Sequence, residues 1–88
     1  MWIPDREDNH FLKNYKKLSS ILQQRTDEKI LELCYSEDPR KLGDHKTGRV
    51  KCLHACKLGR QYRILYDVIF KENTIKFLRV GTHDVYKL

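Results

Sequence analysis

The last ten residues of the chain, RVGTHDVYKL, carry side chains that a globular fold does not need at this place. An apolar, β-branched run ends at Gly81, and His83 and Tyr86 follow it closely. A histidine titrates near neutral pH and can therefore act as an acid or a base in proton transfer. A tyrosine offers an aromatic face and a hydroxyl group. Both residues are therefore candidates for a functional site, whereas Asp84 is interpreted as a local cap or turn former.

Arg63 is a third candidate because of the strand in which it falls. The segment QYRILYDVIF predicts a strand over residues 61–70, and its side chains alternate between two faces. One face is apolar enough to lie under helices and consists of Tyr62, Ile64, Tyr66, Val68 and Phe70. Arg63 and Asp67 fall on the other face, which we expect to be open. Taken alone, Arg63 would be a solvated strand arginine, and Asp67 would be its natural partner.

Two further histidines precede that strand. The segment RVKCLHACKL predicts a strand over residues 49–58, with Val50, Cys52, His54 and Cys56 on one face. His54 is a candidate for proton transfer, although a histidine packed within a strand is the more ordinary interpretation. His45 falls in a loop and is a weaker candidate for the same reason.

The chain is basic, and the base is concentrated in one region. It has 18 Lys and Arg against 12 Asp and Glu, a net charge of +6 and a pI near 9.3. The acidic residues lie mostly before residue 39, whereas base dominates from Arg40 to Arg63. Such a balance favours a polyanion or an acidic protein as partner, and solubility alone is the other interpretation.

The three cysteines are interpreted as reduced thiols. Cys52 and Cys56 would lie about 13 Å apart along a strand, which is too far for one disulfide or one zinc ion. Cys34 falls in a helical pattern and is assigned to the core. The sequence has no signal peptide and no apolar stretch long enough to span a bilayer. We therefore expect a cytoplasmic protein without a metal.

A single domain over residues 1–88 must position these candidates. Pro4 leaves room for only a short edge strand over residues 1–7. Helical spacing follows, with Asp8 or Asn9 as the cap of a first helix and Ser19-Ser20 as a turn or second cap. The second helix has an apolar stripe of Ile21, Leu22, Ile30, Leu31, Leu33 and Cys34.

The second half of the chain is predicted to be β. A loop rich in glycine and proline occupies residues 36–48, and strands are predicted over 49–58, 61–70 and 74–80. The expected fold is α+β, with an N-terminal helical hairpin packed on one face of a small antiparallel sheet. The other face of that sheet would then be open.

Four segments together resemble the RelE/ParE toxin superfamily, in particular its RelE-like, ribosome-dependent mRNA endonucleases. They are FLKNYKKL in the first helix, KLGDHKTG in the loop, LGRQYRILYDV in the hairpin and VGTHDVY at the end of the last strand. The resemblance covers nearly the whole chain, and YRILYDV and the Gly-Thr-His ending are its most specific parts. It implies the RelE-like microbial ribonuclease fold.

The resemblance also implies a role for each candidate. Arg63 would contact the phosphate at the cleaved bond, and Tyr86 would lie close to the scissile nucleotide. His83 corresponds to the basic residue two positions after the terminal glycine. The preceding strand supplies basic residues on the same face, which corresponds to His54 and Cys56, and His45 is the counterpart from the loop. The sequence departs from the family at Cys56, where some members have lysine, and in the shorter gap between His83 and Tyr86.

RNA cleavage without a metal needs a base for the 2′-hydroxyl proton, a cation for the phosphorane charge and an acid for the 5′-oxygen. His83 and His54 are the expected acid–base pair, and Arg63 would stabilise the charge of the transition state. Tyr86 would stack on a base or lend its hydroxyl to proton transfer. Contacts with the RNA backbone are expected from Arg49, Lys51, Lys57, Arg60, Lys46 and His45.

The resemblance thus implies a toxin of a type II toxin–antitoxin module. Its partners would be mRNA in the ribosomal A site and a small acidic antitoxin that folds on binding, with no cofactor and no membrane. Two alternatives remain open: a ParE-like inhibitor of DNA gyrase without a catalytic set, and a decayed toxin fold that only binds a protein. The presence of Arg63, His83 and Tyr86 together favours the nuclease.

Overall fold

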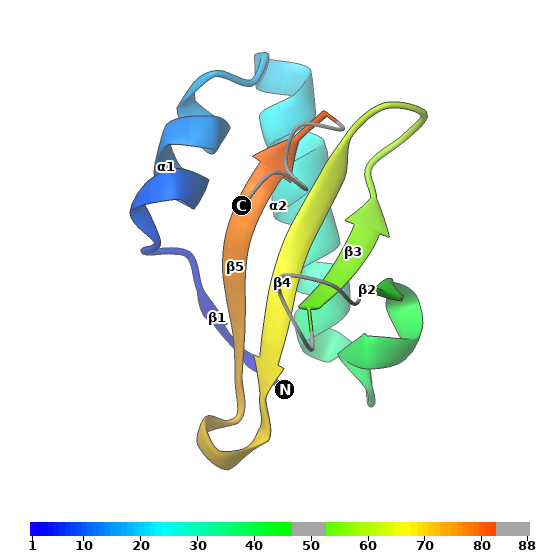
Figure 1. Cartoon of the computed structure of the whole chain (residues 1–88). Coiled ribbons are helices and arrows are strands. Elements are labelled where there is room, and N and C mark those ends of the chain that lie inside the picture. The colour runs from blue at the N-terminus through cyan, green and yellow to red at the C-terminus, as the bar shows by residue number, and fades with distance from the viewer. Residues whose placement is uncertain (47–52, 83–88) are drawn as a thin grey trace.

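The computed structural model describes residues 1–46 and 53–82 of the chain, in which two helices pack on a mixed β-sheet (Figure 1). The helices are α1 (Asn9–Lys16) and α2 (Ser20–Tyr35), with two short 3₁₀ helices, η1 (Pro39–Leu42) and η2 (Phe70–Glu72). The strands are β1 (Ile3–Asp5), β2 (Asp44–Lys46), β3 (Leu53–Lys57), β4 (Arg63–Ile69) and β5 (Thr74–Gly81). They form one sheet in the order β1-β5-β4-β3-β2. The α+β class is confirmed.

Both helices begin at the caps that the sequence predicted. The Asp8 carboxylate accepts hydrogen bonds from the backbone N–H groups of His10 and Phe11, at 2.9 and 3.1 Å. The Ser19 hydroxyl oxygen accepts a bond from the N–H of Leu22 at 3.3 Å. Each cap satisfies N–H groups that have no partner within the helix, and it therefore fixes where the helix starts.

The apolar stripe of α2 is only partly as predicted. Ile30, Leu33 and Cys34 are buried, but Ile21 and Leu31 are 65% and 55% exposed. The buried side chains lie three or four residues apart and follow one face of the helix, which Ile21 and Leu31 do not share. The prediction of these two residues as core was therefore wrong.

The predicted antiparallel meander of β3, β4 and β5 is confirmed, and the sheet extends beyond it on both sides. β1 pairs parallel with β5, with Ile3 opposite Thr74. β2 pairs antiparallel with β3, with His45 opposite His54. The prediction of an unstructured loop over 36–48 was thus wrong, because a strand of three residues is too short to show a period of two in the sequence.

Asn73 anchors the first strand. Its φ of 52° is the left-handed conformation that asparagine tolerates in turns, and it closes the turn between β4 and β5. Its carbonyl oxygen accepts a bond from the N–H of Ile3 at 2.8 Å, and its side chain donates to the carbonyl of Met1 at 2.9 Å. The turn between β4 and β5 therefore also fixes the N-terminal strand.

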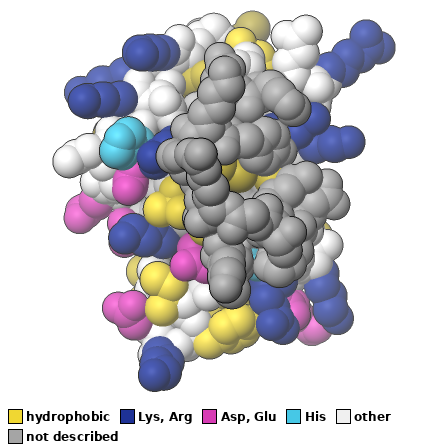
Figure 2. All heavy atoms as spheres, viewed as in Figure 1, with side chains coloured by type: hydrophobic (Ala, Val, Ile, Leu, Met, Phe, Trp, Pro, Cys, Tyr) yellow, Lys and Arg dark blue, Asp and Glu magenta, His cyan; other side chains and the backbone are white. Residues whose placement is uncertain are grey.

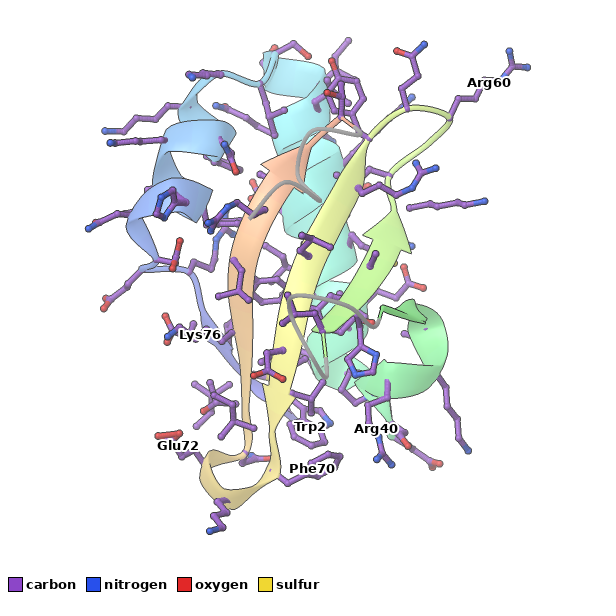
Figure 3. The ribbon with its side chains drawn as sticks, in the orientation of Figure 1. Trp2, Arg40, Arg60, Phe70, Glu72 and Lys76 are labelled. Carbon is purple, nitrogen blue, oxygen red and sulfur yellow. The ribbon has the colours of Figure 1, made fainter. Side chains whose placement is uncertain are left out.

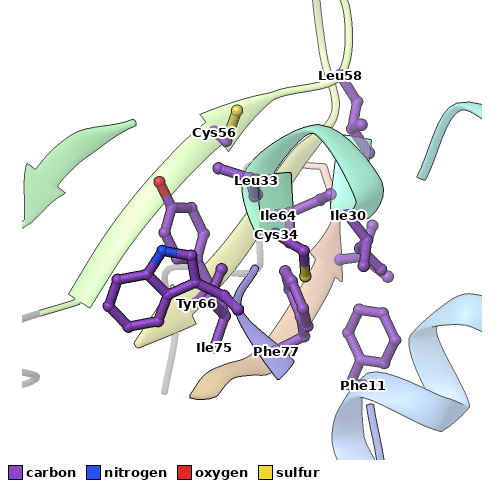
Figure 4. Close-up of a cluster of buried hydrophobic side chains, with 12 residues drawn as sticks. Phe11, Ile30, Leu33, Cys34, Cys56, Leu58, Ile64, Tyr66, Ile75 and Phe77 are labelled. Carbon is purple, nitrogen blue, oxygen red and sulfur yellow. The ribbon is translucent and has the colours of Figure 1, made fainter. Parts of the chain in front are cut away.

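The core lies between the helices and one face of the sheet, where α2 runs behind β4 and β5 and α1 lies beside β5 (Figures 1 and 4). Phe11 of α1 packs against Phe77, with ring centroids 6.0 Å apart. Ile64 and Tyr66 of β4 contribute to the same cluster and are fully buried. Cys34 and Cys56 are both buried, and Cys52 lies outside the described residues.

A β-bulge interrupts the pairing of β4 and β5. Leu65 is opposite Arg79 and Tyr66 is opposite Phe77, so that Leu78 is an extra residue on β5. Phe77 and Val80 are both buried in the core as a result, although they are three residues apart. The bulge therefore resets the register of β5 shortly before its end at Gly81.

Candidate functional site

Arg63 lies where three strands come together. It is the first residue of β4, and its backbone is opposite Lys57 of β3 and opposite Gly81 of β5. One terminal nitrogen of its guanidinium group, Nη1, donates to the carbonyl oxygens of Tyr62 and Arg60, at 3.1 and 3.4 Å. These bonds hold the half-buried side chain at the start of its strand.

The turn between β3 and β4 supplies further basic side chains beside Arg63. The N–H of Leu58 donates to the carbonyl of Tyr62 at 2.9 Å, and Gly59 has a φ of 131°, which favours glycine. Arg60 extends from this turn into solvent (Figure 3). Figure 2 shows Lys and Arg side chains on the upper right rim, over the same turn. We call Lys57, Arg60 and Arg63 the basic turn.

Within residues 1–46 and 53–82, the side chains of the basic turn form no ion pair, although Glu28 and Glu32 of α2 line a hollow together with Lys57. The ion pairs formed by Lys and Arg in residues 1–46 and 53–82 involve Arg6, Lys29, Arg40 and Arg79. Lys57, Arg60 and Arg63 form none within that part of the chain. The Asp67 carboxylate, which the sequence offered as a partner of Arg63, is likewise not paired with it there. The basic turn can therefore attract an anion.

Arg63 lies on the sheet face away from the helices, as predicted. Ile64 and Tyr66 lie on the opposite face of the same strand and belong to the helix-covered core. The prediction of an open face needs one correction, because Leu65 and Ala55 are buried against each other in its middle. Leu65 is 1% exposed. On either side of this buried pair, Arg63 and Asp67 are both half-buried and remain partly accessible.

His54 does not lie with Arg63. It is opposite Tyr66, its ring stacks on the Tyr66 ring with centroids 5.5 Å apart, and it is only 7% exposed. The prediction that His54 shares a face with Arg63 was therefore wrong. Leu53, His54, Ala55 and Cys56 are all buried, so both faces of β3 are covered and alternation alone did not reveal which face holds the site.

Several predicted site residues lie outside what the structure describes. The backbones of His45 and Lys46 belong to β2, where Lys46 is opposite Leu53. The remaining four fall in 47–52 and 83–88, outside the described residues: Arg49, Lys51, His83 and Tyr86. Their roles stay predictions. Gly81 is opposite Arg63, and His83 follows Gly81 by two positions in the sequence.

Arg79 is a basic residue near this face that the sequence did not single out. It is opposite Leu65, because the bulge at Leu78 precedes it. Its Nη1 lies 3.5 Å from the Asp8 carboxylate and donates to the carbonyl of Leu78 at 2.7 Å. A bulge leaves no clear sequence signal, so alternation along the strand does not reveal that Arg79 lies opposite Leu65. Arg79 has an acidic partner, whereas the basic turn has none among the described residues.

At the opposite end of β4, an arginine is paired with an acid and packs on an aromatic ring. Arg40 of η1 forms two bonds with the Asp38 carboxylate, at 2.9 and 2.8 Å, and lies over the Phe70 ring at 4.7 Å. The Trp2 ring meets Phe70 edge-on at 5.2 Å (Figure 3). A hollow of about 600 Å³ lies here, lined by Asp38, Arg40, Lys41, His54, Asp67, Val68 and Phe70. We call Trp2, Asp38, Arg40 and Phe70 the aromatic clamp.

The described segments contain no group of three His, Cys, Asp or Glu side chains that could hold a metal ion. No helix within them is both long and apolar enough to cross a membrane.

Comparison with known proteins identifies the fold. No protein-family model and no curated protein sequence matches the chain. Solved structures do match. A double mutant of the Escherichia coli toxin RelE in the free state is 26% identical, with a TM-score of 0.75, over 98% of this chain and 90% of that chain. The archaeal RelE–RelB complex from Pyrococcus horikoshii OT3 is 25% identical, with a TM-score of 0.68, over 92% and 93%.

A third structure extends the likeness at the level of fold. The toxin–antitoxin complex RelBE2 from Mycobacterium tuberculosis is 19% identical, with a TM-score of 0.77, over 93% of this chain and 90% of that chain. The chain therefore has the fold of the RelE toxins over nearly its whole length. The resemblance drawn from its sequence is confirmed, and these similarities support a RelE-like toxin.

Proposed function

We propose that the chain is the toxin of a type II toxin–antitoxin module and cleaves mRNA on the ribosome as a metal-independent endoribonuclease. Its similarity to RelE structures supports the toxin class. The observation that best supports nuclease activity is the placement of Arg63. This arginine has no acidic partner among the described residues, and it lies opposite Gly81, the last residue of β5. His83 and Tyr86 follow from there in the sequence.

The proposed reaction is an attack of the 2′-hydroxyl oxygen on the adjacent phosphorus. The bond from the 2′-oxygen to phosphorus forms, the bond from phosphorus to the 5′-oxygen breaks, and a proton moves from the first oxygen to the second. The Arg63 guanidinium would stabilise the negative charge that develops on the phosphorane oxygens, because its planar fork matches phosphate geometry. Its bonds to the carbonyls of Tyr62 and Arg60 would keep it oriented before the substrate binds.

Proton transfer falls to the C-terminal residues in this proposal. His54 is buried on the other face of the sheet and is not retained as a partner in catalysis. His83 would act as one acid–base group, a role that typically contributes about 10²–10⁴-fold to the rate. Tyr86 would supply its hydroxyl as the second group or stack on the neighbouring base.

The basic turn would bind the RNA backbone. Lys57 and Arg60 are exposed next to Arg63 and form no ion pair with an acidic residue of the described segments. Such contacts with phosphate are independent of sequence and weaken as salt increases. Arg49, Lys51, Lys46 and His45 are proposed as further contacts of the RNA backbone, with Lys46 opposite Leu53, at the other end of β3 from Lys57.

The second partner is a cognate antitoxin. The similar structures from P. horikoshii and M. tuberculosis are complexes of a toxin with an antitoxin. A chain with a net charge of +6 suits a small acidic protein, whose flexible segment would order itself on the basic surface. The antitoxin would then compete with RNA for the same charges.

The test is expression of the chain in bacteria, followed by mapping of mRNA ends. We expect translation to stop and mRNA to be cut within codons. The His83→Ala variant should relieve the toxicity while the protein remains folded, because His83 is proposed to transfer a proton. The matched control is His10→Ala, which changes an exposed histidine of α1 and should remain toxic.

Two outcomes would contradict the proposal. Toxicity with intact mRNA and trapped DNA gyrase would favour the ParE-like inhibitor. Unchanged mRNA cleavage by the His83→Ala variant would remove His83 from the mechanism.

A further inference from the structure

The outer edge of β5 lacks a strand partner along its second half. β1 pairs with β5 only at Thr74, Ile75 and Lys76, so within the described segments no strand covers the edge from Phe77 to Gly81. α1 lies along this part of the edge (Figure 1). A backbone N–H group that points outward here needs a partner other than a strand.

Asn14 of α1 provides that partner. Its side-chain oxygen Oδ1 accepts a hydrogen bond from the backbone N–H of Val80 at 3.2 Å. The two residues are 66 positions apart in sequence, and the bond is partly buried. Val80 is 1% exposed, so its N–H could not turn to water without moving the strand. A single side chain of α1 therefore ties down the residue that precedes Gly81.

A second contact holds the neighbouring residue. The Arg79 guanidinium lies 3.5 Å from the Asp8 carboxylate, which is also the cap of α1. The start of α1 is thus bound to Arg79 and its middle to Val80. Both contacts come directly after the bulge at Leu78, where the pairing with β4 alone is disturbed.

These contacts fix the part of β5 that lies opposite Arg63. After the bulge, the pairing of Ile64 with Val80 and of Arg63 with Gly81 must be re-established. A bond on the outer edge of Val80 holds the strand in this register from the other side. The chain then continues from Gly81 to Thr82 and the residues proposed to transfer protons.

We propose that Asn14 is a positioning residue of the RNA-cleavage site. It acts through Val80 and Gly81 and fixes the end of β5 opposite Arg63. This inference rests on the proposed function. Since small displacements of reacting groups reduce rates steeply, the effect should fall on the rate of the chemical step and not on RNA binding.

The test compares three variants of the full chain. Asn14→Ala removes the acceptor, Asn14→Asp keeps an oxygen at the same place, and Asn9→Ala makes the same truncation at an exposed position of α1. Cleavage of ribosome-bound mRNA is measured at saturating and at limiting substrate, and amide hydrogen exchange is measured at Val80 and Gly81.

We expect Asn14→Ala to lower kcat by about 10- to 100-fold with KM nearly unchanged, and to speed exchange at Val80. Asn14→Asp should recover most of the rate, and Asn9→Ala should match the wild type. A wild-type kcat in Asn14→Ala would overturn the positioning role while leaving the proposed function intact. So would an equal loss in Asn14→Ala and Asn9→Ala. Absence of cleavage by the wild type would reject the proposed function itself, and this inference with it.

Discussion

An arginine lies near each end of β4, and the two arginines differ in their contacts. At the aromatic clamp, Arg40 makes two bonds to the Asp38 carboxylate and covers the Phe70 ring at 4.7 Å. At the basic turn, Arg63 donates to two backbone carbonyls and forms no ion pair with an acidic group of the described residues. An arginine thus forms an ion pair with a carboxylate at one end of the strand, whereas the arginine at the other end forms none with the described residues.

This difference distinguishes an arginine that stabilises the fold from an arginine that can bind a ligand. A paired arginine that stacks on an aromatic ring joins two segments, and here it links η1 to the turn after β4. An oriented arginine without an acid has charge to offer to a ligand. The comparison therefore assigns the aromatic clamp to stability and the basic turn to binding an anion.

The largest expected effect on RNA binding tests the charge of the two ends with matched pairs of substitutions. Lys57→Gln with Arg60→Gln removes two charges from the basic turn, and Arg40→Gln with Lys41→Gln removes the same two residue types near the clamp. The first pair should raise the dissociation constant for single-stranded RNA by about 10- to 100-fold and reduce the salt slope by about 1.4. The second pair should change it less than about threefold. Fluorescence anisotropy at several salt concentrations measures both, and equal effects would erase the distinction between the ends.

The next effect concerns the attachment of η1 to β4. The Tyr66 hydroxyl donates to the carbonyl of Pro39 at 2.7 Å in a fully buried place. Tyr66→Phe leaves that carbonyl without its donor and should cost about 1–3 kcal/mol in the free energy of unfolding. Tyr62→Phe, on the same strand face but half-buried, is the control and should cost less. Urea unfolding compares the two, and an unchanged midpoint for Tyr66→Phe would contradict the role of this bond.

A smaller effect is expected from the clamp itself. Phe70 is 54% exposed but contacts both Arg40 and the edge of Trp2. Phe70→Ala removes both ring contacts and should cost about 1–2 kcal/mol in the free energy of unfolding. Lys71→Ala on the same turn should have little effect. RNA binding should stay unchanged in both variants, and a loss of binding in Phe70→Ala would move part of the ligand site to this end.

The smallest effect is a dependence of stability on pH at the clamp. The hydrogen bond from Arg40 lowers the pKa of the Asp38 carboxyl to about 2. Because an unfolded Asp has a pKa of about 3.9, the pair stabilises the fold above about pH 4 and loses this contribution as the pH falls toward 2. The difference in thermal midpoint between the wild type and Arg40→Gln should therefore be constant near neutral pH and shrink in acid. A difference that persists unchanged at pH 2 would contradict the pairing.

Much of the fold was predictable because its signals are local. The caps Asp8 and Ser19 and the alternation of β4 correctly gave the helix starts and the face of Arg63. The parallel pairing of β1 was not predictable, since it depends on Asn73, a residue from the far end of the chain. The bulge at Leu78 has no local signature at all.

The candidate site was predictable only in part, for a physical reason. Alternation shows which residues of a strand share a face, but burial decides which face is which. One face of β4 carries both Arg63 and Asp67, whereas the other face is apolar, so Arg63 was placed correctly. β3 is buried on both sides, so His54 was assigned to the wrong one. Asn14 was missed because its partner Val80 is distant in sequence and an asparagine within a helix is ordinary.

The most direct test of the account compares the two arginines in one assay. Purified wild type, Arg63→Gln and Arg40→Gln are incubated with ribosomes stalled on a defined mRNA, and the first-order rate of cleavage is measured. We expect a loss of about 10²–10³-fold for Arg63→Gln, since it removes the charge proposed to stabilise the transition state. Arg40→Gln should cleave at nearly the wild-type rate at a temperature where it is folded. Equal rates for the two variants would contradict the central claim that Arg63 of the basic turn, and not Arg40, is the functional arginine.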